Sequence, residues 1–147
     1  MVEALLVLAK TVIAGLGAAL AALALNYTLL RAQENQRVVI ALLGPVGEET
    51  FKTGLALLGG ASLAGSHMIF GLAEGWWELA GRRRAAGRAR LKPALAALAG
   101  HSLFGVVGAW AYVHSDQALI AWAASLFTHL LWNQLVLVLH HFSNNKT

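Results

Sequence analysis

The chain has 147 residues, of which 58% are hydrophobic and only 12% charged, and its formal net charge is +4. With a mean hydropathy of +0.62, this composition excludes an ordinary soluble domain and indicates an all-α integral membrane protein. Cysteine is absent, which excludes disulfides, thiolate metal sites and a cysteine nucleophile, so any chemistry must come from carboxylates, histidines or hydroxyls.

Five apolar runs are long enough, or nearly so, to cross a hydrocarbon core of about 30 Å as helices. The expected membrane spans are residues 4–30, 38–58, 63–80, 93–114 and 117–141. There is no internal repeat or linker, so we expect a single domain over residues 1–147, a bundle of about five helices. Pro93 is expected at the first helical position of the fourth span. Gly71 and Gly75 are expected to allow close helix packing in the third span.

A basic run fixes the expected topology. Six of the eleven Lys and Arg residues lie between Arg82 and Lys92. Because cytoplasmic loops carry an excess of basic residues, we expect this run in the cytoplasm. With five spans, the amino terminus then lies outside and the carboxyl terminus is cytoplasmic. The run has no interleaved aromatic residues, so we expect it to contact the lipid bilayer and not nucleic acid.

The second span carries Glu48, Glu49 and Lys52 near its middle, within residues 44–52. One charged residue at the centre of a bilayer costs about 2.5–3.5 kcal/mol, so three together need compensating partners and predict a functional site. Lys52 lies four and three residues after the two carboxylates and can reach either. Because the carboxylates point about 100° apart around the helix, one can face water while the other binds the lysine.

Polar side chains on three further spans lie at a similar depth. Counted from the basic side at about 1.5 Å per residue, four residues on four spans lie roughly 9–18 Å deep: Glu48, Glu74, His101 and His129. We therefore expect one polar chamber that opens toward the cytoplasm. Asn133 lies four residues after His129 on the same helix face, so this imidazole and amide can bind a common oxygen.

Several other polar or aromatic residues of the spans are expected at the membrane interfaces, away from the chamber. This group comprises His67 and His114 on the outer side, His140 and His141 at the inner end of the fifth span, and Glu78, Trp76 and Trp77 as interface anchors.

Four motifs on four expected spans bear a family resemblance. They are Glu48-Glu49-Thr50-Phe51-Lys52, Phe70-Gly71-Leu72-Ala73-Glu74, His101-Ser102-Leu103-Phe104 and His129-Leu130-Leu131-Trp132-Asn133. In type, order and spacing they resemble the EExxK, FxxxE, HxxF and HxxxN motifs of the PrsW-type intramembrane proteases. These are glutamic proteases of the wider CAAX-protease superfamily. The resemblance covers about residues 44–133. The chain departs from it at Gly75, where the family usually has asparagine, and it has fewer spans than most members.

The resemblance implies hydrolysis of a peptide bond in or near the membrane by a glutamate-activated water. A carboxylate desolvated in an apolar chamber is a better proton acceptor, which suits general-base catalysis. The implied roles are general base for Glu48, geometry for Glu49 and Lys52, placement of the water or proton relay for Glu74 and His101, oxyanion stabilisation for His129 and Asn133, and support for Phe70 and Phe104.

The implied substrate is a membrane protein, such as a regulatory or anti-sigma-like protein, and the implied location is a prokaryotic plasma membrane. The glutamate mechanism needs no cofactor. An alternative is a zinc protease at the same site, with Glu48, Glu49, His101 and His129 as ligands, although the chain has no HExxH motif. A transporter with a proton or metal relay and a catalytically silent membrane scaffold are two further classes; the lack of a repeat argues against the transporter.

Overall fold

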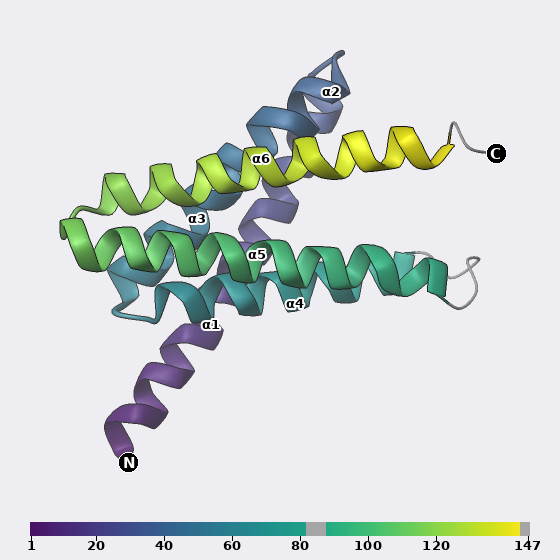
Figure 1. Ribbon diagram of the computed structural model, residues 1–147. Helices are drawn as coiled ribbons and strands as arrows, with labels where there is room; N and C mark the ends of the chain where they lie inside the picture. Colours follow the sequence, from purple (N-terminus) through teal and green to yellow (C-terminus); the bar gives the residue numbers. More distant parts are fainter. Residues whose placement is uncertain (82–87, 145–147) are drawn as a thin grey trace.

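The computed structural model describes residues 1–81 and 88–144, and this part of the chain is helical with no strand. The elements are α1 (Val2–Ala32), α2 (Gln36–Val38), the π-helix η1 (Val39–Leu43), α3 (Gly44–Gly59), α4 (Leu63–Gly81), α5 (Arg88–Ser115) and α6 (Ala118–Asn144). Figure 1 shows α4, α5 and α6 running side by side in alternating directions, while α1 crosses them at a steep angle.

Small residues build the interface that α1 makes with the other helices. Ala14, Gly15, Ala18, Ala19 and Ala22 are buried along one stripe of α1, which packs against α3 and α4. Because their side chains are small, the helix backbones approach closely, as is typical of helix contacts in membranes. The expected first span is therefore confirmed as one long helix.

The expected second span is not one regular α-helix. The chain turns through α2 and η1 before α3 begins at Gly44, whose N–H bonds to the carbonyl of Val39 five residues earlier. Pro45 follows at the start of α3, where its missing N–H leaves a backbone carbonyl of the preceding turn without a donor, so the wider π geometry takes over. α3 ends at Gly60, which has a positive φ of 60° that glycine adopts without strain.

Two predictions about α4 and α5 have opposite outcomes. Close packing at Gly71 and Gly75 is confirmed, because a Cβ at these positions would lie 3.2 Å from the carbonyl oxygen of Ala97 and 3.0 Å from that of Ala94. The prediction that Pro93 starts its helix is wrong, because α5 begins at Arg88 and Pro93 lies inside it. The proline is so near the helix start that it removes only one early backbone hydrogen bond. Residues 82–87 of the basic run lie outside the described residues.

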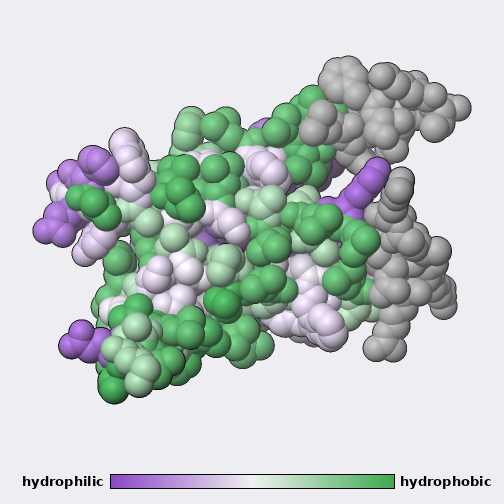
Figure 2. Space-filling view, turned by 60° about the horizontal axis from the view of Figure 1, so that its bottom comes forward, coloured by the Kyte–Doolittle hydropathy of each residue, from purple (hydrophilic) through white to green (hydrophobic). Residues whose placement is uncertain are grey.

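Three of the described helices are long and apolar enough to cross a membrane: Val2–Ala32, Leu91–Ser115 and Ala118–Val136. α3 is shorter, with 16 residues. α4 has 19 residues, but Glu74 and Glu78 lower its hydropathy, so neither helix is among these three. Figure 2 shows one face of the molecule covered mostly by hydrophobic residues, with hydrophilic residues gathered mainly toward its two ends. This distribution suits a protein embedded in a bilayer.

Candidate functional site

A cluster of buried ionisable side chains joins α3, α4, α5 and α6. Glu49, Lys52 and His67 have no exposed surface, and His101 and His129 are only 3% and 5% exposed. Buried charge is costly without a partner of opposite charge and a full set of hydrogen bonds. The contacts within this cluster show how each group is compensated.

Glu49 is the centre of the cluster and accepts three hydrogen bonds. Lys52 Nζ donates to its Oε1 over 2.6 Å, and His129 Nδ1 donates to the same oxygen over 2.7 Å. His67 Nε2 lies 2.9 Å from Oε2. Both carboxylate oxygens are therefore bound, and because Glu49 is fully buried its carboxylate is enclosed by side chains and does not face open space.

Lys52 fixes the tautomer of His101. Its Nζ lies 2.9 Å from His101 Nδ1, and an ammonium can only donate, so Nδ1 must be the bare nitrogen of a neutral ring. The hydrogen is then on Nε2, which donates to Glu74 Oε2 over 2.5 Å. Lys52 also lies 3.9 Å from Glu48 Oε2. One lysine thus connects two carboxylates of α3 to the histidine and glutamate of α5 and α4.

Two aromatic residues line the cluster. Phe70 lies under Lys52 Nζ, 4.3 Å from the ring centroid to the ammonium, and packs edge-on against His101 at 4.8 Å. Phe104 stacks on His129 at 4.5 Å. A cation over an aromatic face is stabilised electrostatically, and the stacked ring restricts the imidazole. These contacts give both predicted supporting residues a physical role.

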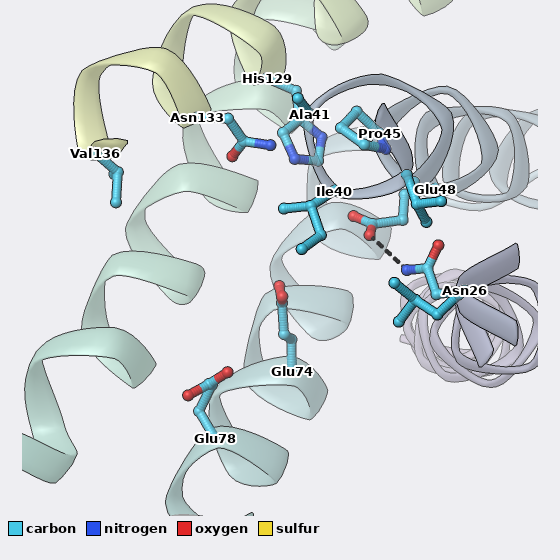
Figure 3. A pocket seen from close by; sticks show the side chains of 13 residues that line it. Asn26, Ile40, Ala41, Pro45, Glu48, Glu74, Glu78, His129, Asn133 and Val136 are labelled. Atoms are coloured by element: carbon cyan, nitrogen blue, oxygen red, sulfur yellow. Dashed lines mark hydrogen bonds between the residues drawn. The ribbon is translucent and has the colours of Figure 1, made fainter. Parts of the chain in front are cut away.

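A cavity of about 500 Å³, which we call the chamber, opens beside this cluster. Its polar lining is Asn26, Glu48, Glu74, Glu78, His129 and Asn133, and its apolar wall includes Val39, Ile40, Pro45 and Val136. Figure 3 shows Glu48, Glu74, His129 and Asn133 arranged around this space from three helices. Glu78 and Val136 lie on the halves of α4 and α6 nearest the basic run, so the chamber lies toward that end of the bundle.

Glu48 is the carboxylate that faces the chamber. Its side chain is 12% exposed, against 0% for Glu49, and Asn26 Nδ2 donates to its Oε1 over 3.1 Å. The opposite oxygen of Asn26, Oδ1, is buried without a hydrogen-bond partner. Asn26 therefore acts toward Glu48 as an orienting donor from α1, a role that the sequence motifs do not include.

The predicted site residues thus meet in one place, but sequence reasoning missed three of its members: Asn26, His67, and Glu78, which was expected as an interface anchor but lines the chamber. Asn26 follows the buried Ala19 and Ala22 of α1 at three- and four-residue steps. This spacing, visible in the sequence, would have placed Asn26 on the face of α1 that packs against the other helices. His67 was expected at the outer surface, and this prediction is wrong. His67 lies three residues before Phe70, so both side chains are on the same buried face of α4. Counting depth along the helix does not show which face a residue is on.

The remaining residues predicted at the membrane interfaces differ in their exposure. His114 is exposed and bonds through Nδ1 to the carbonyl of Trp110, and Trp76 is 70% exposed. Trp77 is partly buried and packs against the cluster of buried α1 alanines and Phe70. The position of all three at a membrane interface stays a prediction. The side chains of His140 and His141 lie outside the described residues.

Three of the residues could also hold a metal ion. Ligand atoms of Glu48, His101 and His129 lie within 4.8 Å of one another, and Glu49 binds His129 Nδ1 in the manner of a carboxylate that orients a zinc-bound histidine. His101 fits less well, because Lys52 and Glu74 already bind its two ring nitrogens. Glu49, included in the predicted zinc set, is occupied by the three bonds described above.

Comparison of the chain with family models, with curated proteins and with solved structures gave no match.

Replacing Asn26 by leucine is expected to leave the fold intact and to weaken whatever Glu48 does. Leucine has nearly the same volume but cannot donate to Oε1, so the carboxylate gains rotational freedom. We expect about tenfold lower activity, as is usual when an orienting partner is removed. Substrate turnover, with Thr28→Val on the exposed side of α1 as the matched control, measures the effect. Equal turnover in both variants would show that Asn26 does not orient Glu48.

Proposed function

We propose that this protein is an intramembrane endopeptidase that hydrolyses a peptide bond of a membrane-protein substrate with a water activated by Glu48. One observation carries the proposal. A carboxylate in a chamber of about 500 Å³ lies beside two histidines whose hydrogen bonds to Glu49, Glu74 and Lys52 orient them. A positioned base next to oriented imidazoles is the arrangement that acyl-transfer chemistry requires.

In the proposed reaction, Glu48 takes a proton from a water in the chamber, and the resulting hydroxide attacks the scissile carbonyl carbon. The oxyanion that forms accepts hydrogen bonds from the Asn133 side-chain amide and from His129 Nε2. The protonated Glu48 then gives up this proton, which Glu74 of the same chamber relays to the leaving amine, while His101 holds Glu74 in place over 2.5 Å. Collapse of the tetrahedral intermediate breaks the C–N bond and leaves a carboxylate and an amine.

The oxyanion role places a condition on His129. Because Nδ1 donates to Glu49, a second hydrogen on Nε2 makes the ring an imidazolium. The buried carboxylate of Glu49 compensates that charge. Fully desolvated donors aimed at developing negative charge are worth about 2.7–4 kcal/mol each in comparable sites, so this arrangement gives His129 a large share of the proposed catalysis.

The topology is part of the proposal. We place five spans in the membrane, with the amino terminus outside and the carboxyl terminus in the cytoplasm, because the basic run then lies on the cytoplasmic side. The chamber lies toward that same end, so a substrate would be cut near the cytoplasmic leaflet of a prokaryotic plasma membrane. α3 and α4 contain the carboxylates and the lysine of the site and pack against the three more apolar helices, which is how intramembrane charge is normally accommodated.

The second candidate is a zinc hydrolase that uses the same chamber. The observation in its favour is the close group of Glu48, His101 and His129, with Glu49 behind His129. Bound zinc would supply a Lewis acid and a hydroxide near neutral pH. In that case His129 is neutral with a bare Nε2, and His101 must lose its contact with Lys52 at Nδ1 or with Glu74 at Nε2. The state of His129 Nε2 thus separates the two candidates.

Treatment with a chelator decides between them. Purified protein in liposomes, supplied with transmembrane peptides that carry basic residues at one end, is expected to cleave with an unchanged rate after chelation and removal of metal. Cleavage in ¹⁸O-labelled water should place one label in the new carboxyl group. Loss of activity on chelation, restored by zinc, would establish the zinc enzyme instead.

The same preparation tests the non-enzymatic alternatives. Proton-coupled uptake into the liposomes without any cleavage product would overturn the hydrolase in favour of a transporter. Neither cleavage nor uptake with any of the peptides, together with stable binding of one of them, would favour a scaffold.

A further inference from the structure

His67 is a buried titratable group that neither the motifs nor the proposed reaction uses. It has no exposed surface, and α5 passes so close that a Cβ on Gly105 would lie 2.5 Å from its Cβ. Its ring lies between two oxygens, with Nδ1 2.9 Å from the carbonyl of Leu63 and Nε2 2.9 Å from Glu49 Oε2.

The hydrogen-bond partners determine where the hydrogens are. A backbone carbonyl only accepts, so Nδ1 must carry a hydrogen. A carboxylate also only accepts, so Nε2 must carry one too, unless Glu49 is itself protonated and donates. Glu49 Oε1 already accepts from Lys52 and His129, which favours the ionised carboxylate.

We infer that His67 is a positioning residue that carries a hydrogen at both ring nitrogens and holds the Glu49 carboxylate in the orientation that His129 requires. Its bond to Oε2 directs Oε1 toward Lys52 and His129. Removal of His67 leaves Oε2 buried without a donor and frees the carboxylate to rotate. The catalytic role of His67 rests on the proposed hydrolase function. The presence of a hydrogen on each ring nitrogen does not depend on that function.

The charges around His67 agree with this inference. The titratable groups that bind Glu49 are Lys52, His67 and His129, and the carboxylates near Lys52 and His101 are Glu48 and Glu74. A charged His67 places a cation against the fully buried carboxylate of Glu49, whereas the side chain of Glu74 is 40% exposed and has less need of a buried partner. A buried charge costs less when it is paired than when it is alone.

The test reads the ring nitrogens directly. Histidine-labelled protein in nanodiscs is examined by ¹⁵N NMR, with the His67 signals assigned by their loss in His67→Gln. Both His67 nitrogens are expected to be protonated in wild type. His114 is the internal reference, because its Nδ1 also meets the carbonyl four residues earlier, at 2.8 Å, but its ring is exposed. In Glu49→Gln, His67 is expected to show one bare nitrogen.

The positioning role has its own readout. In His67→Leu the His129 signals are expected to lose the Nδ1-protonated form, and the rate of cleavage to fall about ten- to a hundredfold, as for other groups that orient a functional histidine indirectly. His67→Gln retains a donor toward Glu49 and is expected to recover part of the rate.

Two results would overturn the inference. One is a bare nitrogen on His67 in the folded wild-type protein. The other is an unchanged His129 signal in His67→Leu. Both come from spectra that require no turnover, so an absence of cleavage would count against the proposed function alone.

Discussion

Glu48→Gln is expected to lower the rate of cleavage by about 10²–10⁴-fold, the usual loss when a general base is removed. Glutamine keeps the shape of the side chain and can still contact Asn26, but its amide does not accept a proton from water. The protein should remain folded, because Glu48 faces the chamber and Lys52 keeps its shorter contact with Glu49 at 2.6 Å. Initial rates on a membrane-anchored peptide in liposomes measure the effect.

The control for this variant is Glu34→Gln, which removes one carboxylate from an exposed position and should cleave at the wild-type rate. Undiminished cleavage by Glu48→Gln would exclude Glu48 as the base. In that case Glu74 becomes the candidate, since it is the other carboxylate of the motifs that lines the chamber.

Lys52→Met is expected to produce the largest loss of stability. Methionine fills most of the space between Phe70 and His101, but Glu49 loses its 2.6 Å partner and Glu48 its nearest cation. Removal of one member of a buried ion pair costs about 3–5 kcal/mol, and here Glu49 keeps only its two histidine donors, so the cluster is left with one excess negative charge. Unfolding in mixed detergent, followed by circular dichroism, should show this decrease in the free energy of unfolding.

Lys10→Met, at an exposed position on α1, is the matched control and should change stability by less than about 0.5 kcal/mol. The double variant Lys52→Met with Glu49→Gln should be more stable than Lys52→Met alone, because it removes the uncompensated carboxylate. If the double variant is instead less stable by the sum of both single effects, the two side chains do not form a coupled pair.

The motif residues could be brought together from the sequence because helical geometry and membrane thickness restrict where they lie. Glu74, His101 and His129 fall at one depth by counting alone, and the structure places Glu74 and His129 in the chamber with Glu48, and His101 directly beside it. The same counting failed for His67, because the face of α4 that it shares with Phe70, and not its depth, determines that it is buried in the cluster. The prediction that Pro93 begins its helix failed because a proline that is favourable at the first helical position can also follow a first turn, as it does in α5.

Composition and helical periodicity are enough to establish the helical class, the apolar character of the chain and the identity of the charged residues that need partners. Only the tertiary structure decided which carboxylate faces the chamber and which is enclosed. Glu48 and Glu49 are adjacent and chemically alike, so nothing local separates them. Their difference arises from neighbours far along the chain, Asn26 for one and His67 and His129 for the other, and only the packing of α1, α4 and α6 around α3 brings those neighbours into hydrogen-bonding distance.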